Sequence, residues 1–221
     1  MTNQSIVSVV DAGVYSYEDK VAIRQAVIDA LERVKANELL HPGQTVLIKP
    51  NLVSDINYNK QGGTYCLYTQ PEVIEPVVEF VCHALKGIGT IVIGDAPVQE
   101  CNFERIRGIR EIVEKYQNRI TDIKLLDLRE LVSVVDNGVH KAKINKDAKG
   151  KIINLGKDSA FYDEDDNTLE KLRITNYDPR ILPKHHKGEI QEYYISEYAL
   201  KADVIINMPK PKAHRKAGMT G

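Results

Sequence analysis

Polar side chains follow three short apolar runs of this sequence, at the point where each run ends. Lys49 and Asn51 come after the apolar residues 46–48, Asp95 comes after a second run, and Asn207 closes a third. Burying a lysine, an asparagine or an aspartate without a partner is costly, so such residues at the ends of buried strands favour a shared polar site. For the first run alone, the alternative is a strand that stops at a proline with a solvated lysine beside it.

The third run leads into the densest group of basic residues. Lys210, Lys212 and His214 alternate with a proline and an alanine, and Arg215 and Lys216 follow. Proline keeps the residue before it extended, and alternate residues of an extended chain point the same way. We therefore expect Lys210, Lys212 and His214 to share one face. A solvated basic tail is the alternative.

These residue types suit the binding of a phosphate or a carboxylate, with Asp95 and His214 as the candidate catalytic pair for proton transfer. Imidazole titrates near neutral pH, so His214 could serve as acid or as base. The same two side chains are too few for a good metal site, and we predict no metal ligands. The residues expected to bind the anion are Lys49, Asn51, Thr69, Asn207, Lys210 and Lys212.

The elements that must position these residues are predicted to alternate between strands and helices. This alternation is typical of an α/β fold, here a layered sandwich with a mostly parallel central sheet. Since ligands bind beyond the carboxyl ends of parallel strands, the polar residues should meet at that edge. The predicted strands are residues 6–10, 45–48, 90–93, 123–126 and 203–207, and the predicted helices are residues 16–34, 69–85, 103–116 and 197–201.

Thr69 enters the predicted site because a helix is expected to start there. Thr69-Gln-Pro-Glu72 has the spacing of a capping box, and the N–H groups of such a helix start would suit an anion. Pro76 interrupts the helical pattern. Because proline removes a helical hydrogen bond, we expect either a kink there or a helix that properly begins at Pro76.

Antiparallel β-structure is predicted after residue 132. Asp136-Asn137-Gly138 between apolar residues is typical of a hairpin with a primed turn. We predict a small antiparallel meander over residues 132–155, within an insertion at about 132–190. The acidic run at residues 163–166 is expected to be a solvated loop.

Composition limits the class of protein. The 221 residues, 43% hydrophobic and 28% charged, predict a single globular α/β domain over residues 1–221. The formal net charge of −1 argues against a nucleic-acid footprint spread over the chain. Because no apolar run approaches a membrane span and no signal peptide is recognisable, we expect no membrane partner and a cytoplasmic location. Cys66, Cys82 and Cys101 are too widely spaced for a disulfide framework, a zinc site or an iron–sulfur motif.

Short motifs at the predicted strand ends occur in order along residues 46–221. They are Val46-Leu-Ile-Lys-Pro-Asn-Leu52, Thr69-Gln-Pro-Glu72, Ile91-Val-Ile-Gly-Asp95, Ala202-Asp-Val-Ile-Ile-Asn-Met-Pro-Lys210, Lys212-Ala-His214 and Gly218-Met-Thr-Gly221. Together they resemble the family catalogued as domain of unknown function 362 (DUF362). In that family the last motif continues into further sequence, which implies that this chain is an N-terminal fragment. Members often accompany ferredoxin-type iron–sulfur modules, which implies an accessory redox role as one alternative, but this chain has no such cysteine cluster.

Two main hypotheses follow from these residues. The first is an enzyme that binds a small anionic metabolite at the strand ends and acts on it by acid/base chemistry. The second is a non-catalytic module that binds an anion or a partner through the same edge. Nucleic-acid binding through the basic tail has less support because the tail lacks interleaved aromatic residues. The substrate, the cofactor and the oligomeric state stay open.

Overall fold

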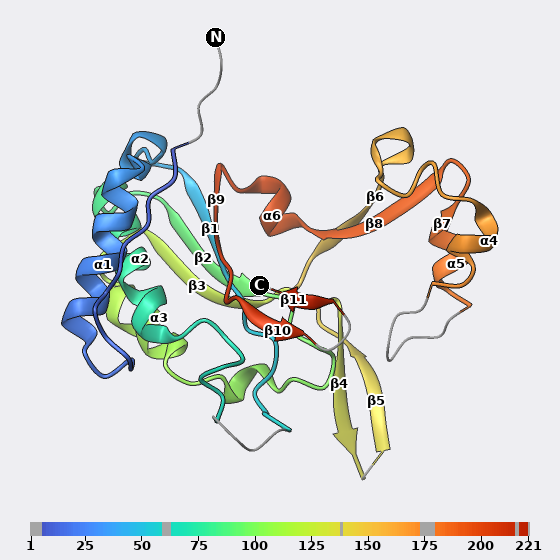
Figure 1. Ribbon diagram of the computed structural model, residues 1–221, viewed down its shortest axis with the longest axis horizontal. Helices are drawn as coiled ribbons and strands as arrows, with labels where there is room; N and C mark the ends of the chain where they lie inside the picture. The colour runs from blue at the N-terminus through green and yellow to red at the C-terminus, as the bar shows by residue number, and fades with distance from the viewer. Residues whose placement is uncertain (1–5, 59–62, 138, 173–179, 215–216, 221) are drawn as a thin grey trace.

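A four-stranded parallel sheet lies at the centre of the computed structural model, in the order β3-β2-β1-β9 (Figure 1). This confirms the predicted α/β fold with a mostly parallel central sheet and small antiparallel additions. The strands are β1 (Thr45–Pro50), β2 (Thr90–Asp95), β3 (Asp122–Asp127) and β9 (Val204–Met208). The residues that the structure describes are 6–58, 63–137, 139–172, 180–214 and 217–220.

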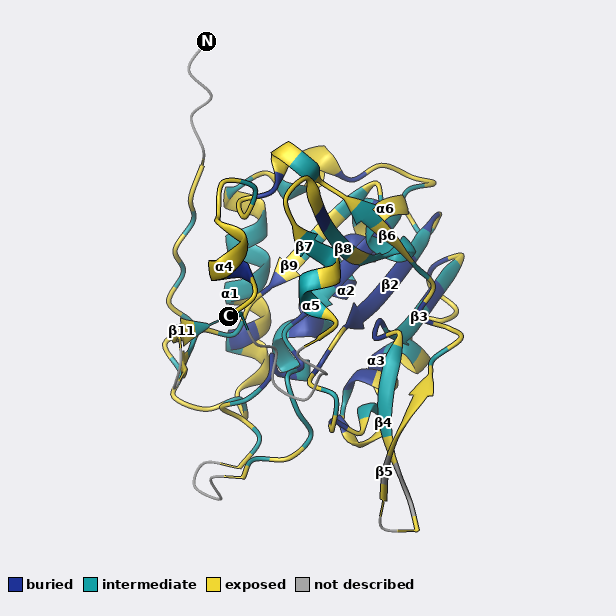
Figure 2. Ribbon diagram, turned by 90° about the vertical axis from the view of Figure 1, so that its right-hand side faces the viewer, coloured by how far each residue is buried: buried dark blue, intermediate teal, exposed yellow. Residues whose placement is uncertain are grey.

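Helices cover the two faces of the sheet unequally. Three of them, α1 (Lys20–Arg33), α2 (Pro71–Ala84) and α3 (Ile109–Tyr116), lie on one side, and the short α6 (Glu197–Lys201) lies on the other (Figure 1). The larger core, which includes Val46 and Ile48, faces the three helices, whereas Leu47 faces α6. β2 is buried along most of its length (Figure 2).

The order of the strands reverses direction beside β1. From β1 the chain passes through α2 to β2 and through α3 to β3, always moving the same way across the sheet. It then returns through α6, on the opposite face, and adds β9 to the free side of β1. Lys49 and Asn207 are register partners in this pair. In open α/β sheets a ligand crevice forms where crossovers leave on one face and arrive from the other, so we expect it here between the ends of β1 and β9.

Helix α2 begins differently from the capping-box prediction. Its N-cap is Gln70, which makes no side-chain cap, and the helix runs from Pro71 through Pro76. Thr69 is buried and donates its hydroxyl proton to Met208 O (2.8 Å). The predicted capping role of Thr69 is therefore wrong, because its side chain bonds to the end of β9 instead. The prediction that the helix might begin at Pro76 is also wrong.

Residues 131–196, which we call the arm, extend away from the sheet (Figure 1). β4 (Leu131–Asp136) pairs with β5 (Val139–Ile144), which confirms the hairpin, although Gly138 of its predicted turn lies outside the described residues. β6 (Gly150–Asn154) pairs with β8 (Ile190–Ser196), and β8 also pairs with β7 (His186–Lys187). The predicted continuous meander over 132–155 is therefore wrong, since the partner of β6 comes from the far end of the arm. The short helices there are η3 (Gly156–Asp158), α4 (Asp166–Leu169), capped by Asp165, and α5 (Leu182–His185).

The segment before α1 is extended but forms no strand, so the predicted strand at residues 6–10 is wrong. Val9 and Val10 border a cavity against α1 and Pro209 instead of pairing with a neighbouring strand. Asp19 caps α1 by accepting a hydrogen bond from Ala22 N.

The remaining elements are η1 (Ala36–Leu39), η2 (Phe103–Arg105), β10 (Lys212–His214) and β11 (Gly218–Thr220). The described residues include no helix that is long and apolar enough to span a bilayer.

Candidate functional site

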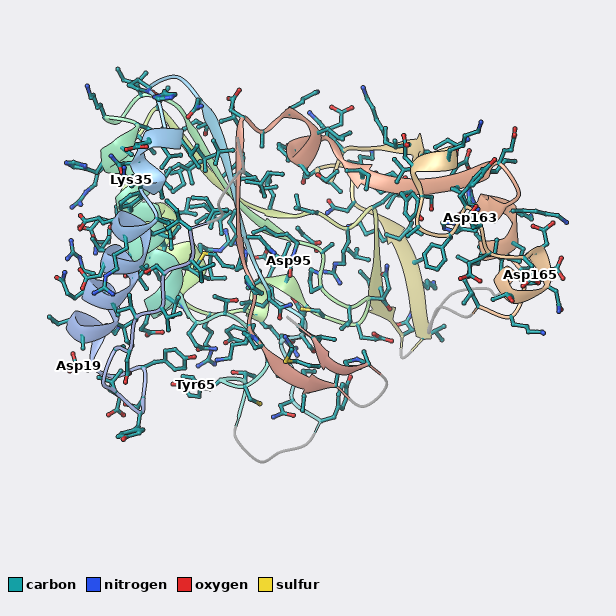
Figure 3. The ribbon with its side chains drawn as sticks, turned by 45° about the horizontal axis from the view of Figure 1, so that its top comes forward. Asp19, Lys35, Tyr65, Asp95, Asp163 and Asp165 are labelled. Carbon is teal, nitrogen blue, oxygen red and sulfur yellow. The ribbon has the colours of Figure 1, made fainter. Side chains whose placement is uncertain are left out.

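Lys49 and Asp95 form an ion pair at the carboxyl ends of β1 and β2. Lys49 Nζ lies 2.9 Å from Asp95 Oδ1, and Asp95 Oδ2 accepts a hydrogen bond from Leu52 N (2.7 Å). Asp95 is only 5% exposed, whereas the Lys49 side chain is 42% exposed. A buried carboxylate is tolerated when a cation and an amide compensate it. Lys49 therefore compensates the charge of Asp95 while part of its own side chain stays exposed. Asp95 lies between the helices and the arm (Figure 3).

Asn51 and Thr69 connect the ends of three elements. Asn51 N donates to Thr69 Oγ1 (3.1 Å), and Thr69 N donates to Asn51 O (2.9 Å). With the bond from Thr69 to Met208 O, these contacts hold the end of β1, the start of α2 and the end of β9 together. Both donors of Thr69 are thus occupied within the protein. The first turn of α2 is less suited to an anion than the sequence predicted, because Pro71 has no N–H to donate and Glu72 is negatively charged.

Lys212 reaches back from β10 to the end of β1. Its Nζ donates to Asn51 Oδ1 (2.7 Å) and to Lys210 O (2.9 Å). Burial lowers the pKa of Lys212 below its ordinary value, the charge of Lys210 lowers it further, and Asp95 opposes both effects. The pKa of Lys212 is lowered overall because burial, together with the charge of Lys210, outweighs the effect of Asp95.

Lys210 bonds to an aromatic side chain from the other end of the chain. Its Nζ donates to Tyr17 OH (2.5 Å) and lies 4.9 Å from the centre of that ring. Tyr17 in turn stacks on Tyr65, with ring centres 6.1 Å apart. A cation close to an aromatic face is held by the ring's negative charge density. The position of Lys210 is therefore set from the segment that precedes α1.

The two remaining predicted residues lie nearer the surface. Asn207 is exposed and is the register partner of Lys49. His214 is exposed in β10, and its Nδ1 accepts a hydrogen bond from Ala217 N (3.0 Å) within the β10–β11 hairpin. Side-chain contacts thus join Lys49 to Asp95 and Lys212 to Asn51, whereas the bond from Ala217 N to His214 lies within one hairpin. Arg215 and Lys216 of the predicted basic run lie outside the described residues.

The sequence analysis did not identify three residues near this edge of the sheet, namely Tyr17, Asp127 and Arg129. Tyr17 gave no signal, because a tyrosine in a polar segment is unremarkable. Asp127 and Arg129 did give one, since they follow a predicted strand as Asp95 follows another. The buried Arg129 guanidinium bonds to Asp127 and to the carbonyl oxygens of residues 98, 99 and 101, so it holds the loop that follows Asp95.

The donor set at this edge is nitrogen-rich and cationic, with Asp95 as its carboxylate. Within the described ranges, no group of three or more His, Cys, Asp or Glu side chains is arranged to hold a metal ion. Cys101, buried near Asp55, has its pKa raised to about 11, mainly by burial. A thiol with so high a pKa is a poor nucleophile at neutral pH. Ammonium groups of this kind can bind a phosphate or a carboxylate.

Comparison with known proteins gives one match. Residues 46–158 and 132–221 match the model of a family described as Domain of unknown function (DUF362). The chain belongs to this family. No curated protein and no solved structure matches it. The match takes in β1, β2, β3 and β9 and the candidate site from Lys49 to His214, whereas Tyr17 and α1 of this DUF362 protein lie before it.

Proposed function

We propose that this DUF362 protein binds a small metabolite bearing a phosphate or a carboxylate and acts on it by acid/base chemistry. The observation that supports this most is the reversal of strand order between β1 and β9. In open α/β sheets, ligands bind in the crevice at such a reversal, beyond the carboxyl ends of the strands. Lys49, Asn51, Asn207, Lys210 and Lys212 all lie on the two chain segments that border it.

The charges at this crevice favour an anion. Lys49, Lys210 and Lys212 supply three positive charges, and Asp95 supplies one negative charge. An anionic group placed here would raise the lowered pKa of Lys212, because an opposite charge stabilises the ammonium form. Binding and protonation of Lys212 are therefore expected to support each other.

Acid/base chemistry would begin with Lys49 turning from Asp95 to the ligand. That movement would free Asp95 Oδ1, while Leu52 N would still hold Oδ2. A carboxylate that loses its cation binds a proton more readily, so Asp95 could then act as a general base. His214 is the second proton-transfer group of the proposal, brought to the ligand by the β10–β11 hairpin.

The test is a calorimetric titration with inorganic phosphate, methyl phosphate and acetate. We expect Lys49→Ala and Lys212→Ala to weaken the binding of the preferred anion about tenfold or more, the usual loss when a hydrogen bond to a charged group is removed. Lys124→Ala is the matched control, because Lys124 pairs with Asp122 on β3 away from the crevice. Wild-type affinity in both site variants would overturn the proposal.

The pH dependence of binding is the second test. Because the free protein's Lys212 has a pKa below 10.5, its ammonium form is lost earlier than that of an ordinary lysine as pH rises. Anion affinity should therefore be full at neutral pH and begin to fall on the alkaline side below 10.5. Lys212→Arg should keep its affinity to higher pH, since arginine stays protonated. An identical alkaline profile for the two proteins would exclude Lys212 as a ligand group.

A non-catalytic binding module is the alternative that the contacts favour. Both oxygens of Asp95 and Nδ1 of His214 already have partners in the protein. If these groups have only a structural role, the wild-type protein should show no turnover in any substrate screen. Asp95→Asn should then only weaken anion binding. The accessory role beside an iron–sulfur system, like the cytoplasmic location, remains a prediction from the sequence.

A further inference from the structure

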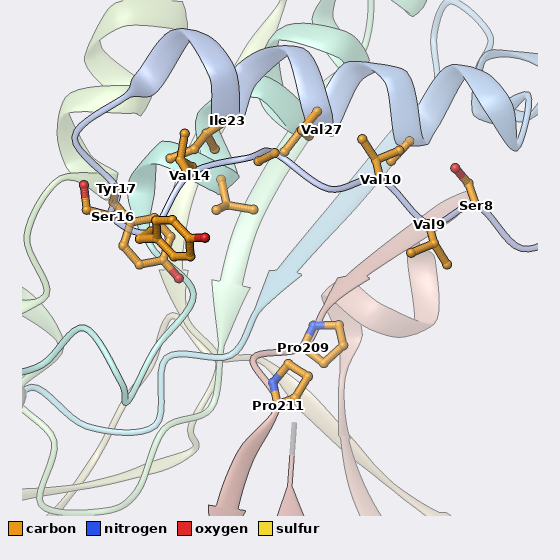
Figure 4. A pocket seen from close by; sticks show the side chains of 15 residues that line it. Ser8, Val9, Val10, Val14, Ser16, Tyr17, Ile23, Val27, Pro209 and Pro211 are labelled. Atoms are coloured by element: carbon orange, nitrogen blue, oxygen red, sulfur yellow. The ribbon is translucent and has the colours of Figure 1, made fainter.

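A cavity of about 890 Å³ lies beside the cationic crevice, between the segment before α1, α1 itself and the residues that follow β9 (Figure 4). Its walls are mostly apolar and include Val10, Val14, Ile23, Val27, Pro209 and Pro211. No aspartate, glutamate, lysine, arginine or histidine is among the residues that line it. Its size is within the range usual for small-molecule pockets, which are typically ~300–1,000 Å³.

The cavity and the cationic crevice share one piece of chain. Pro209 and Pro211 line the cavity, and Lys210 stands between them. The Lys210 ammonium bonds to the hydroxyl of Tyr17, a residue that also lines the cavity. Lys212, the next basic residue, turns to Asn51 at the end of β1. A row of cations therefore runs from the border of an apolar cavity to the proposed anion site.

The cavity leaves apolar surface uncovered. Val9 and Tyr15, both on its lining, are 84% and 109% exposed. Apolar side chains gain free energy when a ligand removes them from water. A small anion would bind the lysines but leave this apolar surface exposed to water. A ligand that also has an apolar part would bind the lysines and cover the apolar surface.

We propose that the ligand is a soluble anion with an apolar chain, whose charged group binds at Lys210 and Lys212 and whose chain fills the cavity against α1. This inference rests on the proposed function and narrows its ligand class from small anions to amphipathic ones. It also gives a role to the segment before α1, which forms no strand and lines the cavity.

The experiment compares ligands of increasing chain length. Methyl, butyl and octyl phosphate, with acetate, butyrate and octanoate as the carboxylate series, are titrated into the full chain by calorimetry. We expect affinity to rise roughly fourfold for each added methylene group, the increase that corresponds to burial of a CH₂. Octanol, which lacks the anion, should bind far more weakly than octyl phosphate.

Variants of α1 test whether the alkyl chain of the ligand binds in the cavity. Ala26→Phe and Ala30→Phe add bulk to the cavity wall, and Val21→Phe is the matched control on the exposed face of the same helix. Either cavity variant that retains the wild-type circular dichroism should lose the dependence on chain length, while its affinity for methyl phosphate is unchanged. The control should behave as the wild type. Chain-length dependence that persists in both cavity variants would overturn the inference.

The outcomes separate this inference from the proposed function. If all members of a series bind equally and Lys212→Ala weakens them all, the anion site stands and the apolar subsite is wrong. If no anion binds, or Lys212→Ala changes nothing, the proposed function itself fails. If the protein sediments with phosphatidic acid vesicles and Ala26→Phe abolishes this, the ligand is a membrane lipid. That result would overturn the inference that the ligand is soluble.

Discussion

The parallel sheet and the arm both contain β-strands, yet these strands bury their side chains to very different degrees. Val46 and Ile48 of β1 are 0% exposed, whereas Ile144 of β5 and Ile152 of β6 are 65% and 57% exposed. β1 has a strand on each side and helices over both faces, with α6 on one and the three longer helices on the other. β4 and β5 pair only with each other in the described part of the chain.

The difference shows that the strand pattern alone does not determine how much a strand stabilises the protein. A strand within layers gains from burial on its faces, while an outlying hairpin gains mainly from its own ladder of hydrogen bonds. The candidate site lies on the buried region, where positions are held most firmly. Substitutions that compare the two regions can break or sharpen this contrast, and we give them from the largest expected effect to the smallest.

The junction between the regions should be the most sensitive point. Arg129 and Asp127 form a buried pair, and Arg129 also bonds to three carbonyl oxygens. Arg129→Ala would leave these groups unpaired, so we expect a loss of about 3–5 kcal/mol in the free energy of unfolding, measured with urea. Arg110→Ala, which removes an exposed pair with Glu104, should cost no more than about 1 kcal/mol. Equal losses would mean that the buried pair does not anchor the junction.

Apolar residues should show the contrast next. Ile48→Ala removes a fully buried side chain from the core, so we expect the free energy of unfolding to fall by about 2–5 kcal/mol. Ile152→Ala in the arm removes an exposed one and should change it by no more than about 0.5 kcal/mol. Urea unfolding followed by circular dichroism gives both values. A large loss at Ile152 would show that the arm has an apolar partner.

Two threonines provide the smallest comparison. Thr69→Val removes the hydroxyl that donates to Met208 O and accepts from Asn51 N, so both groups lose a buried partner. We expect a loss of about 1–3 kcal/mol, measured by thermal unfolding. Thr168→Val in the arm removes an exposed bond to Asp165 and should leave the melting temperature unchanged. If Thr69→Val leaves the melting temperature as unchanged as Thr168→Val does, the contrast between the two regions does not hold.

The buried strands were the part of the fold most readily predicted from sequence. Residues 46–48 and 91–93 are continuous apolar runs, which is typical of strands covered on both faces, and they lie in β1 and β2. Residues 123–126, which include Lys124, lie in the half-buried edge strand β3. Residues 6–10 are similarly rich in β-branched residues but form no strand, because no strand in the described part of the chain pairs with them. Residues 150–154 were assigned the wrong partner, since β8 is separated from β6 by the rest of the arm.

The polar residues that stand at the strand ends could be predicted from sequence, whereas their contacts could not. Lys49, Asn51 and Asp95 could be named because each stands where an apolar run ends. Their partners could not, since the Lys49–Asp95 pair joins two strands and the Lys210–Tyr17 contact joins opposite ends of the chain. The expected role of Thr69 as a cap failed for the same reason. A better acceptor, Met208 O, was brought to it by the tertiary fold.

By itself, the sequence determined which residues form the buried strands and helices and which polar residues end the strands, because both depend on neighbours along the chain. The tertiary structure decided that β9 lies beside β1, that the strand order reverses there, and that a cavity lies between α1 and the residues after β9. These features depend on contacts between segments far apart in the sequence. Such contacts form only when the whole set of buried faces packs together, so no local pattern contains them.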